Sequence, residues 1–233
     1  MTEAQFAESQ PLEPGTLLEE LPVFPLPNAV LFPHTLLPLH VFEPRYRALV
    51  EHAMGADRRF GIAMLEDGYE PLYYGAPPVH PVLCVGEIVT LQALPDGRSN
   101  VLLRGVARGR IVEELRTPHE FRMMSVRVEG SELGGRQGDA LARELATVRQ
   151  LFASLVARAP QMQLADADAL FSPDADVEQV LDAIAGAIPA DPKAKQALLT
   201  ERNVASRAGL LAEFLAEAVG SSFGVAPTEA EPG

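Results

Sequence analysis

Prolines constrain the segment from Leu21 to Val50 more than any other feature constrains this chain. Six of them stand between Pro22 and Pro44, among aliphatic and aromatic residues. Each proline fixes the backbone angle φ and removes a backbone donor, so no long helix can pass through the segment. Strands in the centre of a sheet are disfavoured for the same reason. We therefore predict short strands broken at bends, as on the rim of a small barrel.

The end of this segment changes to the pattern of a helix. Pro44 suits the first helical position, where its missing N–H removes no hydrogen bond. Apolar residues then recur at helical spacing, and Gly55 can end the helix. The sequence thus predicts two proline-bent strands, between Leu21 and Leu39, that lead into an amphipathic helix from Pro44 to Met54.

The next stretch, up to about residue 130, has the short apolar runs and turn residues of β structure. Pro95-Asp96-Gly97 is a hairpin turn signal, and Gly86 is a candidate bulge. The predicted strands are Arg59–Leu65, Val82–Leu94, Ser99–Gly105, Arg108–Leu115 and Phe121–Val128.

After Gly130 the hydrophobic period becomes that of helices. One apolar stripe runs over residues 141–155 and another over residues 177–188. Asp191-Pro192 is an N-cap followed by proline, and Asn203 can cap a last helix. The sequence therefore predicts an α+β fold, in which a β domain with one early helix precedes a C-terminal helical bundle.

Composition divides the chain into four predicted regions. Residues 1–19 are an acidic lead expected to be disordered, residues 20–130 the β domain, residues 131–220 the bundle, and residues 221–233 a disordered tail.

The N-terminus has no basic start or apolar core, so we expect no signal peptide. A single cysteine, Cys84, fits a reducing compartment. We expect a cytoplasmic protein without membrane attachment.

The charge distribution argues against a nucleic-acid partner. The net charge is −13, and residues 21–130 carry 11 arginines against 12 acidic residues. A nucleic-acid binder normally has a net basic footprint, and this β domain has none.

No motif for catalysis is present. The chain has only two lysines, Lys193 and Lys195, and neither has the flanking glycine and Ser or Thr of a phosphate-binding loop. Ser154 lies within a helical stripe and not in the G-x-S-x-G elbow of a serine hydrolase. We therefore predict no enzyme activity, no catalytic residue and no cofactor.

His34, His40 and Glu43 are close in sequence and could form a metal site. They lack the H-E-x-x-H spacing that places two ligands on one helix face. We expect ordinary turn or partly buried histidines and no metal. Cys84 stands in an apolar strand, so we expect a buried structural thiol.

Two polar groups have both a functional and a structural interpretation. Glu43, Arg45 and Tyr46 could contact a peptide at the helix start. The favoured alternative is a carboxylate stabilised by the free N–H groups of the helix, an arginine paired with it, and a packed tyrosine.

Arginines near the predicted hairpin form the second such group. Arg104, Arg108 and Arg110 could bind an acidic segment or phosphate. The nearby Glu113 and Glu114 favour a solvated surface of mixed charge.

The loop of residues 66–81 is the predicted partner contact. It holds three of the four tyrosines of the chain, and tyrosine is enriched in binding hot spots. Packing of the loop over its own domain is the competing interpretation. The candidate peptide-binding residues are Tyr69, Leu72, Tyr73 and Tyr74.

Several blocks resemble the Lon substrate-binding domain, the N-terminal domain of the ATP-dependent protease Lon. They are LPVFPL, VLFP, LPLHVFEPRYRAL, RFGIAML, VGEIV and DGRSNVLLRGVARGRI, with a helical end, and together they cover about residues 20–215. The resemblance implies a PUA-like β pseudo-barrel packed beside a helical bundle, in a stand-alone form without ATPase or peptidase domains.

The resemblance also implies a function. We expect a non-catalytic protein of quality control, or an adaptor, that binds unfolded or extended polypeptide and works with a protease or chaperone. The alternatives left open are an RNA-binding PUA-like module and an unspecified interaction scaffold.

Overall fold

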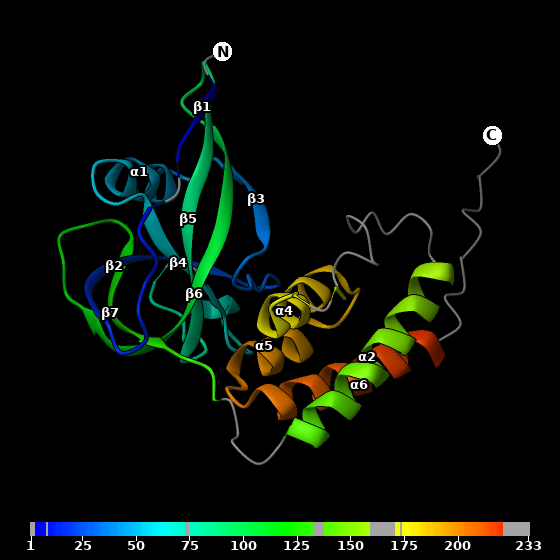
Figure 1. Ribbon diagram of the computed structural model, residues 1–233. Helices are drawn as coiled ribbons and strands as arrows, with labels where there is room; N and C mark the ends of the chain where they lie inside the picture. Colours follow the sequence, from blue (N-terminus) through cyan, green and yellow to red (C-terminus); the bar gives the residue numbers. More distant parts are fainter. Residues whose placement is uncertain are drawn as a thin grey trace, which may run out of the picture.

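The computed structural model describes residues 3–7, 9–72, 75–132, 138–158, 171–172 and 174–220, without the side chains of residues 3, 138 and 139. Strands form one part of the molecule and helices extend from it (Figure 1). The strands are β1 Glu3–Gln5, β2 Leu17–Leu26, β3 Leu36–Val41, β4 Arg59–Met64, β5 Val82–Ala93, β6 Ser99–Leu115 and β7 Arg122–Glu129. The helices are α1 Pro44–Met54, the 3-10 helix η1 Glu70–Leu72, α2 Gly138–Arg158, α4 Val177–Ala187, α5 Pro192–Thr200 and α6 Val204–Gly220.

The strands form one curled sheet. Their order is β1-β5-β4-β2-β7-β6-β3, and β5 pairs with β6 in addition. The pairings of β5, β4, β2, β7 and β6 therefore lead back to β5, as in a pseudo-barrel. Among the strands that the structure describes, β2 and β4 are the one parallel pair. The predicted fold class is confirmed: a β-rich part with one early helix is followed by helices.

Two apolar clusters lie on the two sides of the curled sheet. The smaller is drawn from alternate positions of the strands, as the period of two requires. It contains Leu21, Val23, Ala63, Leu83, Val85, Met124 and Val126. The larger joins the opposite face of the sheet to α1 and to the C-terminal helices. The β part and the helical part thus share one core.

β2 corrects the prediction that prolines keep this segment out of the centre of the sheet. It is ten residues long and lies between β4 and β7. It pairs with β7 only as far as Val23 and with β4 only from Val23 onward. The carbonyl of Leu26 accepts a hydrogen bond from the N–H of Leu65, so the backbone polar groups of Leu26 face β4. These groups point to opposite sides in successive residues of a strand, so those of Pro25 face away from β4 and those of Pro22 face toward it. Each missing N–H thus faces a side where the ladder is absent.

β6 corrects a second prediction. The two strands expected around residues 106–107 are one strand of 17 residues, with register shifts where it meets β5 and β7. Gly105 allows the strand to pass close to the segment between β2 and β3. A Cβ atom there would lie 2.0 Å from the carbonyl oxygen of Phe32, closer than any side chain permits. The predicted bulge at Gly86 is confirmed by a register shift between Val85 and Gly86.

The N-terminal segment differs from the disordered lead that was expected. β1 pairs with β5, and the N–H of Gly15 donates to the carbonyl of Val128 at 2.9 Å. β2 then begins at Leu17. The polar composition predicted disorder here. Strand pairing and hydrogen bonds to distant parts of the chain nevertheless give the described residues of this segment a defined place. The predicted tail, residues 221–233, lies outside the described residues.

Cap residues predicted from the sequence set the starts of two helices. Asp191 accepts a hydrogen bond from the N–H of Lys193 at 2.7 Å, and Asn203 from that of Ser206 at 3.0 Å. Asp176, directly before the expected stripe, caps α4 by accepting hydrogen bonds from the N–H groups of Glu178 and Gln179. α2 and α6 pack on each other, and α5 contacts β5 (Figure 1).

A buried ion pair joins the helices to the sheet. Arg108 of β6 and Asp182 of α4 are 5% and 1% exposed, and the guanidinium binds both carboxylate oxygens. Its Nε donates to the carbonyl of Leu199 at 3.1 Å. Gln196 of α5 donates to the carbonyl of Val82 at 2.8 Å. These polar contacts fix how the helices sit on the β5–β6 ladder.

Removal of one partner of this pair leaves a buried, uncompensated charge. We expect Asp182→Ala to lower the free energy of unfolding by about 3–5 kcal/mol in urea titrations. The apolar double variant Arg108→Met/Asp182→Leu should recover most of this loss. Glu114→Ala, which breaks the more exposed pair with Arg122, should cost about 0–1 kcal/mol. Equal losses from Asp182→Ala and Glu114→Ala would contradict the role assigned to the buried pair.

Candidate functional site

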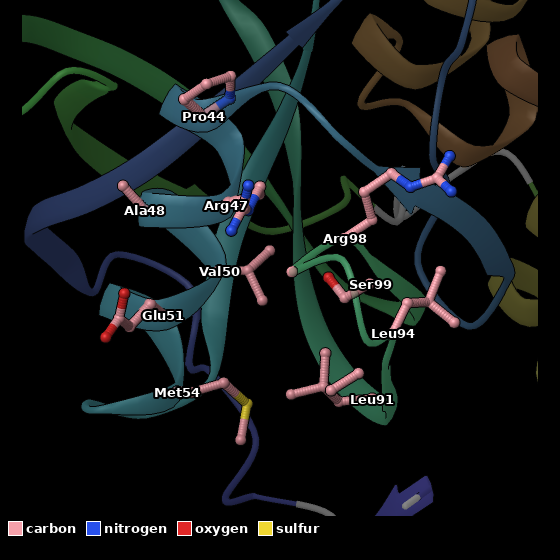
Figure 2. A pocket seen from close by; sticks show the side chains of 12 residues that line it. Pro44, Arg47, Ala48, Val50, Glu51, Met54, Leu91, Leu94, Arg98 and Ser99 are labelled. Carbon is pink, nitrogen blue, oxygen red and sulfur yellow. The ribbon is translucent and has the colours of Figure 1, made fainter. Parts of the chain in front are cut away.

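Helix α1 and the β5–β6 hairpin enclose an open groove of about 590 Å³. Figure 2 shows the two walls: Arg47, Val50 and Met54 stand on the helix and face Leu91 and Leu94 of the hairpin. The groove is therefore apolar in its middle and charged at its rim. Its size is in the range of pockets that take up small molecules or side chains of a partner.

The position of α1 follows from its amphipathic sequence. Its start at Pro44 is confirmed, and Tyr46 stacks on Phe24 of β2 with ring centroids 3.9 Å apart. The apolar stripe of the helix is buried against the larger core. Arg47, Glu51 and Met54 are spaced three or four residues apart, so they share the neighbouring face, which lines the groove.

The hairpin wall is held by its turn. The β5–β6 ladder continues to Ala93 opposite Ser99, and the N–H of Leu94 donates to the carbonyl of Arg98 at 2.8 Å. Gly97 has a φ of +81°, which confirms the predicted turn. A Cβ atom at Gly97 would lie 2.1 Å from Nη2 of Arg47, so the arginine lies directly over the turn.

Charges at the rim are balanced. Asp96 accepts a hydrogen bond from Nε of Arg98 at 2.6 Å. This bond lowers the pKa of the Asp96 carboxyl and raises the pKa of Arg98. Arg47 and Glu51 stand one helical turn apart and bring opposite charges. A groove with an apolar middle and a balanced rim suits an uncharged apolar segment better than a polyanion.

The Glu43 group has the structural role that was favoured. Glu43 is the extended N-cap residue of α1, and its carboxylate lies 2.9 Å from Nη2 of Arg45. Tyr46 is buried, and Arg45 lies over its ring at 4.6 Å. The carboxylate makes no cap hydrogen bond, so it acts at the helix start through its charge and its pairing with Arg45.

The three arginines near the hairpin do not form one surface. Arg104 pairs with Glu87 at 3.2 Å and Arg110 with Glu129 at 2.6 Å. Arg108 corrects the prediction of a solvated face, since it is the buried partner of Asp182. No pattern in the sequence indicates that Arg108 pairs with Asp182, because the two residues are far apart along the chain.

The predicted tyrosine loop lies apart from the groove, beside α5. Lys193 of α5 contacts Asp67 of the loop at 2.6 Å, and this hydrogen bond raises the pKa of Lys193. Tyr69 is half-buried, and Leu72 in η1 is 53% exposed. The other two predicted residues, Tyr73 and Tyr74, lie outside the described residues. Among the described residues of the loop, Leu72 is thus the one large hydrophobic side chain that is exposed.

Ser154 and Lys195 each make a hydrogen bond to a backbone carbonyl. Ser154 donates its hydroxyl to the carbonyl of Gln150 at 2.9 Å on its own helix. Lys195 donates to the carbonyl of Gly186 at 2.9 Å, and burial lowers its pKa. The expected buried thiol is confirmed at Cys84, whose pKa is raised by burial.

The two histidines considered as metal ligands lie in a turn and on a strand. His34 is in a turn with a φ of +64°, and His40 contacts the side chain of Asn100 at 2.7 Å. Within the described ranges, no three His, Cys, Asp or Glu side chains converge as metal ligands would. None of the described helices combines the length and apolar content needed to cross a membrane.

Sequence reasoning missed the groove. Arg47 and Met54 were predicted on a helix and Leu91 and Leu94 on or near a strand, but none was singled out. The signal was the exposed stripe of α1 together with the Pro-Asp-Gly turn. Neither feature indicates that the turn lies against the helix, because that contact joins residues far apart in the sequence.

Fold and groove together define a class of α+β domain, in which a curled sheet with a flanking helix precedes a helical bundle. The family model of the ATP-dependent protease La (LON) substrate-binding domain matches residues 20–217. The chain belongs to that family.

Relatives and solved structures agree with this. Lon protease of Xanthomonas oryzae pv. oryzae is 28% identical over 210 residues, which are 90% of this chain and 24% of the relative. Lon protease of Escherichia coli is 26% identical over 190 residues, 81% of this chain and 23% of the relative. This chain therefore spans about a quarter of their length.

Among solved structures, the N-terminal domain of Mycobacterium avium complex Lon protease matches with a TM-score of 0.67 and 18% identity. The match covers 85% of this chain and 99% of that one. A Lon N-terminal domain protein from Xanthomonas campestris matches with a TM-score of 0.54 and 22% identity, over 82% and 95% of the two chains. Both likenesses concern the fold.

The turn at Gly97 gives a direct test of how the groove is held. We expect Gly97→Ala to lower the free energy of unfolding by about 1–2 kcal/mol, because a Cβ atom is strained at this φ and meets Arg47. Gly220→Ala, at a position where a Cβ atom meets open space, is the matched control. Thermal unfolding of both variants measures the difference, and equal midpoints would show that the turn is not closed in this way.

Proposed function

We propose that this chain is a non-catalytic polypeptide-binding protein that takes up apolar or extended segments of unfolded proteins. It would act in the cytoplasm in protein quality control, or as an adaptor for a protease or chaperone. The observation that carries the proposal is the match of residues 20–217 to a substrate-binding domain family. The groove between α1 and the hairpin supports it, because it is a ready place for apolar side chains of a client.

The chemistry of the groove supports a polypeptide client over a nucleic acid. Met54, Leu91 and Leu94 are half-buried, so a client side chain placed between them would remove further apolar surface from water. Burial of one such side chain stabilises a complex by about 1.5–3 kcal/mol. The balanced rim charges supply no row of cations for a phosphate backbone.

The groove is tested by its apolar walls. We expect the chain to bind alkylated, fluorescein-labelled casein, and Leu94→Ser and Met54→Ser each to weaken binding about tenfold, the equivalent of about 1.4 kcal/mol. Val112→Ser removes an equally apolar side chain that is 54% exposed on β6 away from the groove, and should bind like the parent chain. Fluorescence anisotropy measures all four proteins. If casein binds no better than a folded protein of similar charge, the proposed function is wrong.

The tyrosine loop is proposed as a second contact, formed by Tyr69, Leu72, Tyr73 and Tyr74. The exposure of Leu72 supports it. We expect Leu72→Ser to weaken casein binding less than Leu94→Ser does, by about threefold, because one side chain at a rim contributes little. Leu36→Ser, with a side chain 57% exposed on β3, is its control. Equal affinities of Leu72→Ser and Leu36→Ser would remove the loop from the binding surface.

A further inference from the structure

The N-terminal segment lies on the molecule as an extended peptide. β1 adds to the edge of β5, with Ala4 opposite Leu91 (Figure 1). The N–H of Phe6 continues the ladder by donating to the carbonyl of Val89 at 3.1 Å. Leu91 also lines the groove. The segment therefore borders the groove and extends the sheet there by one strand.

Without this segment the outer half of β5 would have an open edge. β4 pairs with β5 only between Cys84 and Glu87. Beyond Glu87, β1 is the strand on that edge among the strands that the structure describes. An open edge presents N–H and C=O groups that readily pair with an extended chain. The same edge can accept a strand from another polypeptide.

One arginine grips the segment through three groups. The ring of Phe6 packs on the larger core, and the guanidinium carbon of Arg58 lies 5.0 Å from its centroid. Nη2 of Arg58 donates to the carbonyl of Ala7 at 2.9 Å and contacts the hydroxyl of Ser9 at 3.0 Å. Arg58 has a φ of +63°, a strained conformation for a residue with a side chain. Such strain is common at positions that clamp a ligand.

A buried carboxylate receives part of its hydrogen bonds from the segment. Glu87 is 1% exposed, and it accepts from the N–H of Ser9 at 2.9 Å and from its hydroxyl at 2.6 Å. Arg58 and Arg104 complete its partners at 3.1 and 3.2 Å. Burial alone would raise the pKa of Glu87, but the bonds from Ser9 and Arg104 hold this pKa below its usual value. A hydroxyl-bearing residue thus has a defined place on this edge.

We propose that the N-terminal segment, described at residues 3–7 and 9–10, is an intramolecular strap that occupies the strand-addition site for client polypeptides. Clients displace the strap and take its place on β5. The site selects an extended segment with an aromatic residue and, three positions later, a serine or threonine, as in Phe6 and Ser9. This inference rests on the proposed polypeptide binding and adds to it a strand site, a preferred sequence and a built-in competitor.

Competition by the strap sets the size of the expected effect. A segment tethered close to its site acts at an effective concentration of about millimolar. Any client for the same edge therefore meets a local competitor, and its apparent affinity falls by the fraction of molecules in which the edge is free. A strap fixed in place should abolish strand addition, and a released strap should increase it.

A reversible disulfide can fix the strap in the full chain. Gln5 stands opposite Thr90. Phe6 and Val89 form a hydrogen-bonded pair, and in an antiparallel ladder such pairs alternate with non-hydrogen-bonded ones. Gln5 and Thr90 are therefore a non-hydrogen-bonded pair, whose Cα atoms lie about 4.5 Å apart. That separation suits a disulfide. The native thiol of Cys84 is fully buried and will not interfere.

The test compares Gln5→Cys/Thr90→Cys in oxidised and reduced form, with the parent chain under both conditions as control. Alkylated, fluorescein-labelled casein is the probe in fluorescence anisotropy. We expect the oxidised variant to bind casein at least tenfold more weakly than the same protein after reduction, and the parent chain to be unaffected. Equal casein binding by the locked and unlocked forms would overturn the strap while the proposed function stood.

A second experiment presents the strap in trans. A labelled peptide of residues 1–14 should bind a chain that lacks residues 2–10 at least tenfold more tightly than it binds the full chain. The same peptide with Phe6→Ser should lose at least tenfold, and casein should compete with the parent peptide. Absence of peptide binding to the shortened chain, with thermal unfolding showing that it is folded, would refute the strap site.

The two proposals fail in different ways. If the peptide binds the shortened chain but neither protein binds casein, the strap site is supported and the proposed function is wrong. Ser9→Ala adds an independent readout in the full chain. Loss of the hydroxyl donor should raise the pKa of Glu87, measured by carboxyl NMR, and an unchanged pKa would contradict the contact.

Discussion

The ladder between β5 and β6 is the interaction on which the rest of the molecule depends. It runs from Val82 opposite Arg110 to Ala93 opposite Ser99, and it is part of the ring of pairings that curls the sheet. At one end, Arg108 and Val82 hold the helices through buried polar contacts. At the other end, the hairpin projects past β4 and forms a wall of the groove. One ladder thus connects the bundle to the candidate site.

Local patterns predicted most of the elements. Helix starts at Pro44, Asp191-Pro192 and Asn203 were read correctly, because each depends on the chemistry of adjacent residues. The errors share one cause. β2 is central despite its prolines, and Arg108 is buried, because strand order and helix docking bring distant residues together. No spacing along the chain reports those contacts.

The candidate site was less predictable than the fold. Its walls come from α1 and from the hairpin, and its bordering strand comes from an acidic segment that composition alone assigns to disorder. Glu87 shows why: a buried carboxylate needs donors, and Ser9 supplies two of them from 78 residues away. The tyrosine loop was the more visible candidate in the sequence, yet it lies beside α5 and not at the groove.

The most direct test of polypeptide binding at the groove is an NMR titration of the isotope-labelled chain with an unfolded casein fragment. The account predicts that backbone shifts concentrate on residues 47–54 of α1, residues 89–99 of the hairpin, and the strap. Residues of α2 and α6 should remain unchanged. Shifts confined to the helical bundle, with α1 and the hairpin silent, would contradict the central claim.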